Sequence, residues 1–113
     1  MNDTSPSTRR TNRRHDRLSV NISVRVFRGK GQVALGRGHD IGVGGMAVYV
    51  PLELAVGTLL DISFQLPYSR IVLGIRSIVR NTDGFRYGVE FVNLTPFEAE
   101  EIERVTSILK LTA

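Results

Sequence analysis

The chain has 113 residues and a mass of 12.6 kDa, the size of one small domain, which excludes a two-domain enzyme. Its 42% hydrophobic and 23% charged residues are typical of a globular protein, neither disordered throughout nor embedded in a membrane. The absence of cysteine excludes a disulfide framework, a thiolate metal site and a cysteine nucleophile. No segment approaches the roughly 20 apolar residues of a membrane span, and no apolar signal region follows the basic N-terminus, so we expect a cytoplasmic protein without membrane insertion.

Positive charge is concentrated at the N-terminal end. Residues 1–30 contain eight Arg or Lys residues against Asp3 and Asp16, a net charge of +6, whereas residues 31–113 sum to −2. Nearly all of these cations are arginine, whose planar guanidinium can bind phosphate through two hydrogen bonds and stack on flat rings. This distribution predicts an anionic partner.

The first 17 residues are polar. They contain no apolar residue after Met1, so they cannot bury enough surface to offset the entropy of being ordered. We therefore expect residues 1–17 to form a flexible, Arg-rich tail and residues 18–113 to form the folded domain.

Alternating apolar and polar residues begin at Leu18 and continue to Val26, which predicts a half-buried β-strand. After a turn at residues 29–31, residues 32–41 and 46–50 predict a second and a third strand. A fourth, with alternate residues from Leu60 to Leu66 pointing inward, ends at Pro67, and a fifth covers about residues 70–80. A turn at residues 81–84 then leads to a sixth, with Phe85, Tyr87, Val89 and Phe91 on one face. The strands have antiparallel meander spacing.

One helix is predicted, at the C-terminal end. Thr95 is a suitable N-cap, Pro96 suits the first helical position and Glu98 completes a capping box. The apolar stripe that follows consists of Phe97, Ile102, Val105, Ile108 and Leu109. The predicted fold is all-β, a six-stranded antiparallel barrel with a C-terminal helix as its plug or lid.

The sequence does not favour an enzyme. His15 and His39 lack a third ligand at zinc-like spacing, so no metal site is expected. There is no GxSxG elbow, no Walker sequence and no GxGxxG opening a helix. The glutamates at the start of the helix favour its macrodipole and form a solvated face.

The arginine run has RxxxR spacing, ending with Arg13 and Arg17 where the first strand begins. Two guanidinium groups four residues apart on a flexible segment can close on a compact anion that carries phosphates and flat bases. Taken alone, however, the run is better explained as a solvated tail that binds polyanions without specificity.

A second feature is the glycine-rich segment from Asp40 to Gly45. Glycine lets backbone N–H groups approach an anion closely, and the Asp40 carboxylate can accept from the adjacent N1–H and N2–H donors of guanine. Taken alone, this segment is better explained as a β-bulge or tight turn.

Together the two features resemble the PilZ domain family, whose motifs are an RxxxR before the first barrel strand and a [D/N]xSxxG one strand later. In this chain Asp40-Ile41-Gly42-Val43-Gly44-Gly45 stands in the place of the second motif. The resemblance continues through Tyr87 to Leu94, which is similar to the glycine-containing penultimate-strand signature of the family, and through the helix. It covers nearly the whole chain from Arg13.

The resemblance implies a barrel that binds the bacterial second messenger cyclic di-GMP as its ligand, with no cofactor and no catalysis. Arg13 and Arg17 would wrap around phosphates and guanines, with Arg14 as a helper. Asp40 would accept from the guanine edge, and Gly45 would be the closing glycine of the motif. The resemblance also offers Arg80 as a residue that stacks on a guanine, although a solvent-facing arginine explains it better.

Gly42 is the one departure, because it stands where the family pattern has serine. One ligand hydrogen bond is therefore absent. A net hydrogen bond contributes roughly 0.5–1.5 kcal/mol, so we expect binding weakened by around tenfold and not abolished.

The preferred interpretation is a cyclic di-GMP receptor whose Arg tail orders over the nucleotide and signals to a downstream effector protein. The first alternative is a degenerate PilZ-like barrel that acts as a protein-interaction adaptor without nucleotide binding. A nucleic-acid-binding barrel ranks third, because residues 31–113 carry a net −2 charge and no basic and aromatic face is predicted.

Overall fold

The computed structural model describes residues 17–112 as six β-strands followed by one α-helix. The elements are β1 (Leu18–Arg28), β2 (Gly31–Gly42), β3 (Gly45–Tyr49), β4 (Leu59–Gln65), β5 (Val72–Asp83), β6 (Arg86–Phe91) and α1 (Pro96–Thr112). The prediction of six strands and a C-terminal helix is confirmed.

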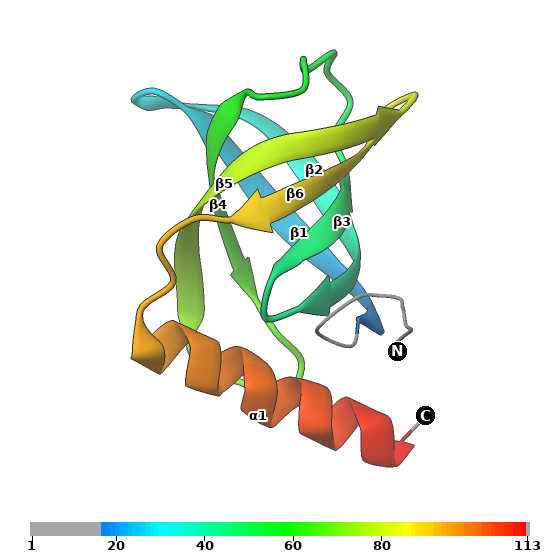
Figure 1. Cartoon of the computed structure of the whole chain (residues 1–113), viewed down its shortest axis with the longest axis vertical. Helices are drawn as coiled ribbons and strands as arrows, with labels where there is room; N and C mark the ends of the chain where they lie inside the picture. Colours follow the sequence, from blue (N-terminus) through cyan, green and yellow to red (C-terminus); the bar gives the residue numbers. More distant parts are fainter. Residues whose placement is uncertain (1–16, 113) are drawn as a thin grey trace, which may run out of the picture.

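The strands close into an antiparallel barrel in the order β1-β2-β3-β6-β5-β4 (Figure 1). This order is not that of a plain meander, because β3 pairs with β6 and β4 returns to pair with β1. The connection from Val50 to Thr58 therefore crosses from one part of the barrel to another. The closure pairs Val24–Phe27 of β1 with Asp61–Phe64 of β4.

The core fills the barrel with alternate strand residues, as period-two patterning requires. In β1 the residues Ile22, Val24 and Val26 are buried, and their neighbours are exposed. The helix lies across one end of the barrel (Figure 1), where Ile102 and Val105 are fully buried in the same cluster. The helix therefore acts as a lid on the core.

The helix begins as predicted. The N–H of Glu98 donates to Oγ1 of Thr95 (3.1 Å), and the N–H of Thr95 donates to Oε1 of Glu98 (2.9 Å), which is a complete capping box. Phe97, however, is 58% exposed, so its place in the buried stripe was predicted wrongly. It lies in the first turn, before the part of the helix that reaches the core.

The β5–β6 hairpin differs from the predicted one. β5 continues through Asn81 to Asp83, and the turn is shortened to Gly84 and Phe85, with Gly84 at φ +64°. Phe85 is 43% exposed instead of facing the core with Tyr87. It packs edge-on against Tyr49 outside the barrel, with ring centroids 6.3 Å apart.

Beside two register shifts between β1 and β2, one β-bulge interrupts the pairing of β2 with β3 and another that of β5 with β6. His39 has no partner on β3, because Gly38 pairs with Val48 and Asp40 with Ala47. Arg80 likewise has no partner on β6, because pairing passes from Val79 directly to Asn81. Bulges re-aim side chains and increase the local twist of a strand. Here each one lies immediately before a residue of the candidate site.

Candidate functional site

The β1–β2 hairpin brings the two predicted motifs together. Ser19 pairs with Asp40 in the antiparallel register, so Arg17 at the entrance to β1 lies beside Asp40 near the end of β2. Nη1 of Arg17 donates to Oδ1 of Asp40 over 2.9 Å. Both side chains are about a quarter exposed, so the ion pair is accessible to a ligand.

Asp40 also begins a row of outward-facing residues across four strands. The register pairs Asp40 with Ala47, Ala47 with Gly88, and Gly88 with Asn81. The middle of this row therefore carries only a methyl group and a glycine. The Asn81 amide lies over Gly88, where a Cβ would come within 2.6 Å of its Oδ1, so a flat group could approach the backbone of β6 only if this exposed side chain turned aside.

The row forms the bottom of a hollow of about 450 Å³ on the outer wall of the barrel. Arg17 and Asp40 lie on one side, and the β5–β6 hairpin contributes the other. The lining consists of Arg17, Asp40, Ala47, Asn81, Asp83, Arg86 and Gly88. Charged and polar side chains thus surround the two small residues, Ala47 and Gly88.

The Asp40 carboxylate is the centre of this arrangement. Oδ1 accepts from Arg17 and from the backbone N–H of Ala47 (3.2 Å), which fixes its orientation against β3. Oδ2 faces Nη2 of Arg86 at 3.7 Å, a distance longer than a hydrogen bond. One carboxylate oxygen is therefore held by the protein, and the other is available to a ligand.

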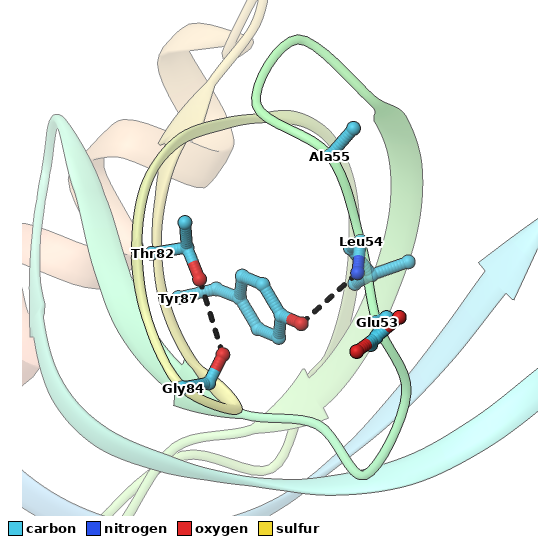
Figure 2. A pocket seen from close by; sticks show the side chains of 6 residues that line it. All are labelled: Glu53, Leu54, Ala55, Thr82, Gly84 and Tyr87. Carbon is cyan, nitrogen blue, oxygen red and sulfur yellow. Dashed lines mark hydrogen bonds between the residues drawn. The ribbon is translucent and has the colours of Figure 1, made fainter.

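A second hollow of about 480 Å³ lies between the loop after β3 and the β5–β6 hairpin (Figure 2). Its central feature is Tyr87, whose hydroxyl donates to the carbonyl of Leu52 (2.6 Å) and accepts from the N–H of Leu54 (3.0 Å). Among the described residues that line it, Glu53 is the only charged one. With no cation in its lining, this hollow is a poor candidate for an anionic ligand.

Two of the six predicted site residues, Arg17 and Asp40, line the charged hollow. Gly42 and Gly45 lie at the β2–β3 turn, where they pair with each other, and are not part of the lining. Arg13 and Arg14, like most of the predicted tail, lie outside the described residues. The part of the site that the structure describes is therefore the Arg17 and Asp40 half of the prediction.

Gly45 has a packing reason to be glycine. It is buried, and a Cβ at this position would collide with the backbone carbonyl of Val89 on β6. Gly42 is also buried, but it is not among the glycines with positive φ in the described chain, which are Gly29, Gly57 and Gly84. A residue with a side chain can therefore adopt the backbone conformation of Gly42.

Arg80 does not line the hollow; its Nε donates to Oε1 of Glu90 (2.5 Å). Sequence reasoning missed Asn81, Asp83, Arg86 and Gly88 instead. Asn81 and Asp83 were assigned to a turn. Arg86 and Gly88 belong to β6, which pairs with β3 although the two strands are not consecutive in the sequence. The only local indication was the alternation of β6, which places Arg86 and Gly88 on the face of the strand that points away from the buried Tyr87.

Within residues 17–112 no three His, Asp or Glu side chains gather in a way that could hold a metal ion. Over the same residues, no helix is long and apolar enough to cross a membrane.

The fold and the site define a class of protein, a six-stranded antiparallel barrel with a terminal helix and a charged hollow on its outer wall. The family model of the PilZ domain matches residues 11–107. The chain belongs to the PilZ domain family, whose members are non-catalytic and typically bind cyclic di-GMP. No curated protein matches the chain by sequence.

Solved structures share the fold. The PilZ domain with c-di-GMP of YcgR from Escherichia coli superposes with a TM-score of 0.73 at 18% identity, covering 90% of this chain and 94% of that one. The Bacillus subtilis inhibitor of motility MotI/DgrA gives 0.77 at 16%, covering 93% and 54%. The K. pneumonia MrkH–c-di-GMP complex gives 0.73 at 20%, covering 89% and 52%. The chain thus spans about half the length of the latter two.

Proposed function

We propose that this protein is a cyclic di-GMP receptor that binds the nucleotide in the charged hollow beside Arg17 and Asp40. The observation that carries the proposal is the juxtaposition of these two residues, 23 positions apart in sequence, at the edge of the hollow. They are the members of the two family motifs that the described residues include.

The chemistry of the hollow suits this ligand. Guanine presents two adjacent donors, N1–H and N2–H, to which a carboxylate such as Asp40 is complementary. Ala47 and Gly88 present only small groups beneath the exposed Asn81 amide, and Arg17 is available for a phosphate or a guanine ring. The lining carries the positive charges of Arg17 and Arg86 and the negative charges of Asp40 and Asp83, so its net charge is zero. Because the nucleotide carries two phosphates, additional cations must come from outside the hollow.

The Arg-rich segment of residues 1–17 is the source of those cations in this proposal. Arg13, with Arg14 as a helper, reaches the ligand from the chain just before β1, and the segment closes over the nucleotide. The surface offered to a downstream effector protein then changes with occupancy, while residues 18–113 form the barrel and its helix. Closing of the segment is the proposed switch.

The relatives support this proposal through their own descriptions. The YcgR domain and MrkH structures contain c-di-GMP, MrkH is described as a c-di-GMP dependent transcription regulatory factor, and MotI/DgrA is an inhibitor of motility. Transcription and motility are therefore the kinds of output to which this receptor could be coupled through a partner.

Calorimetric titration of the full chain with cyclic di-GMP, with GTP and cyclic AMP as controls, tests the proposal. We expect saturable heat with cyclic di-GMP and none with the controls. No heat with any nucleotide would favour the protein-interaction adaptor, for which the replacement of the motif serine by Gly42 is the specific observation.

A further inference from the structure

Arg86 of β6 and Asp83 of β5 are the two charged groups on the far side of the hollow that the proposed function does not use, and Arg86 is the cation. Its Nη2 lies 3.7 Å from Oδ2 of Asp40, and its side chain is 56% exposed. Among the described residues this is the one ion pair of Arg86, and its distance is too long for a hydrogen bond between the two side chains. Arg17, by contrast, already donates to Oδ1 over 2.9 Å. Oδ2 of Asp40 is therefore flanked by a guanidinium that is near it but not hydrogen-bonded to it.

A donor beside an acceptor is a pattern that distinguishes the two purines. Guanine carries the O6 acceptor next to the N1–H donor, and N7 beyond O6 is a second acceptor. Adenine carries the N6 amino donor next to an unprotonated N1 acceptor, which is the reverse order. Arginine is the side chain that most often reads O6 and N7 of guanine.

We propose that Arg86 and Asp40 act as a pair that selects guanine over adenine. Arg86 donates to O6 and N7 while Oδ2 of Asp40 accepts from N1–H, and the exposed Asn81 side chain, which lies over Gly88, turns aside to admit the base. Adenine in the same position would place its amino group against the guanidinium and its N1 lone pair against the carboxylate, so these two contacts become repulsive and only the contact to N7 remains. This inference rests on the proposed function of the hollow.

The strand pairing explains how Arg86 is held in position. Arg86 lies between Tyr49 of β3 and Asp83 of β5 in the register, immediately after the turn residue Phe85. The edge-on contact of Phe85 with Tyr49 fastens that turn to β3. The guanidinium therefore projects from a supported backbone, although its own end remains free.

The test compares the affinities of the full chain for cyclic di-GMP and cyclic di-AMP, measured by calorimetry. Arg86→Ala is the test variant. Arg76→Ala is the matched control, because Arg76 is 57% exposed and also pairs with an aspartate of the neighbouring strand, Asp61, at 3.3 Å. The unaltered chain should prefer the guanine nucleotide, and Arg86→Ala should reduce that preference by about 5- to 150-fold, the range for one bidentate base contact. Arg76→Ala should leave it unchanged.

The ratio of affinities separates base recognition from charge. If Arg86 acts only on the phosphates, both nucleotides weaken equally in Arg86→Ala, the ratio is unchanged and the inference is overturned. If the unaltered chain binds both nucleotides equally, the inference is also overturned, but the proposed receptor function stands. If the unaltered chain binds neither, the proposed function fails first and takes this inference with it. Thermal melts check that each variant remains folded.

Discussion

Arg17 is the residue on which the described half of the site depends. We expect Arg17→Ala to weaken cyclic di-GMP binding by about 10- to 150-fold, since a charge-assisted contact contributes roughly 1.5–3 kcal/mol. Its position before β1 and outside the core means that the melting temperature should change little. Calorimetry with parallel thermal melts measures both quantities.

Arg13→Ala should behave in the same way as Arg17→Ala, and Arg9→Ala, outside the RxxxR pair, serves as the control with a much smaller loss. Equal losses for Arg9 and Arg13 would show a diffuse polyanion-binding segment in place of a defined motif.

Gly42 is where the chain departs from the family pattern. Because its φ is not positive, serine can adopt the same backbone, so Gly42→Ser should tighten cyclic di-GMP binding by up to roughly tenfold and slightly raise the melting temperature. Gly42→Ala, which adds the Cβ without the hydroxyl, is the matched control and should not tighten binding. Weaker binding by Gly42→Ser at unchanged stability would mean that this position does not face the ligand.

Gly45 is the point of close approach between β3 and β6. Gly45→Ala should lower the free energy of unfolding by about 1–3 kcal/mol, because the new methyl group meets the Val89 carbonyl, which cannot move without disturbing the ladder. Gly74→Ala is the control, since a Cβ at that strand position meets nothing within 4 Å. Urea unfolding of both variants measures the difference, and equal stabilities would contradict the packing explanation.

How much of the site could be predicted depends on which contacts are local. Arg17 and Asp40 were predictable because each belongs to a motif and one hairpin brings the motifs together. Arg86 and Asn81 were not, because their place in the hollow depends on β3 pairing with β6 and on the bulge at Arg80. Neither of these leaves a pattern in the sequence nearby.

At the scale of elements, the helix is fastened to the β4–β5 loop by a charged cluster around Glu101. Arg104 donates to both carboxylate oxygens of Glu101 (3.1 and 2.8 Å), and Oγ of Ser69 donates to Oε2 (2.5 Å). Arg104 also donates to the carbonyl of Tyr68 (2.8 Å), a non-glycine residue at φ +62°. The cluster thus holds both the helix and an unusual loop conformation.

This cluster makes part of the stability dependent on pH. The hydrogen bonds from Arg104 and then Ser69 lower the pKa of Glu101 from 4.5 to about 2. Because the pKa in the folded state is the lower one, the stabilisation is fully present above about pH 4.5 and is lost as the pH falls towards 2.

Glu101→Gln should therefore be less stable than the unaltered chain at pH 7, and the difference should shrink as the pH falls through about 2 and vanish only below it. Thermal melts across this range measure it, with the exposed neighbour Glu100→Gln as the control. A difference that stays constant with pH would show that the carboxylate charge is not involved.

The elements themselves were largely predictable, because strict alternation identifies strands and the Thr95 capping box identifies the start of the helix. The errors fall where tertiary contacts override local signals. The residues Asn81-Thr82-Asp83-Gly84 have turn composition, but pairing with β6 keeps the first three in β5. Phe85 has the period of a core residue, but it is held outside by Tyr49.

At the scale of the whole molecule, salt should separate a specific nucleotide site from general polyanion binding. Cyclic di-GMP carries two phosphates, so its affinity should fall gently as salt rises. Binding of the N-terminal segment to DNA would neutralise several phosphates and should fall steeply. Titrations at several salt concentrations measure the two slopes, and tight DNA binding at physiological salt with no cyclic di-GMP heat would favour the nucleic-acid-binding alternative.

The two bulges have a consequence for how the barrel tolerates changes of chain length. His39 has no partner on β3, and Arg80 has none on β6. If either residue were removed, every remaining residue of its strand would still point to the same face of the barrel, inward or outward, as before. Removal of a paired residue would instead reverse the parity of everything beyond it unless the bulge moved to absorb the change. Each bulge is therefore a spare position in the ladder, through which these two strands can lose a residue and still present Asp40 and Asn81 on the outer wall.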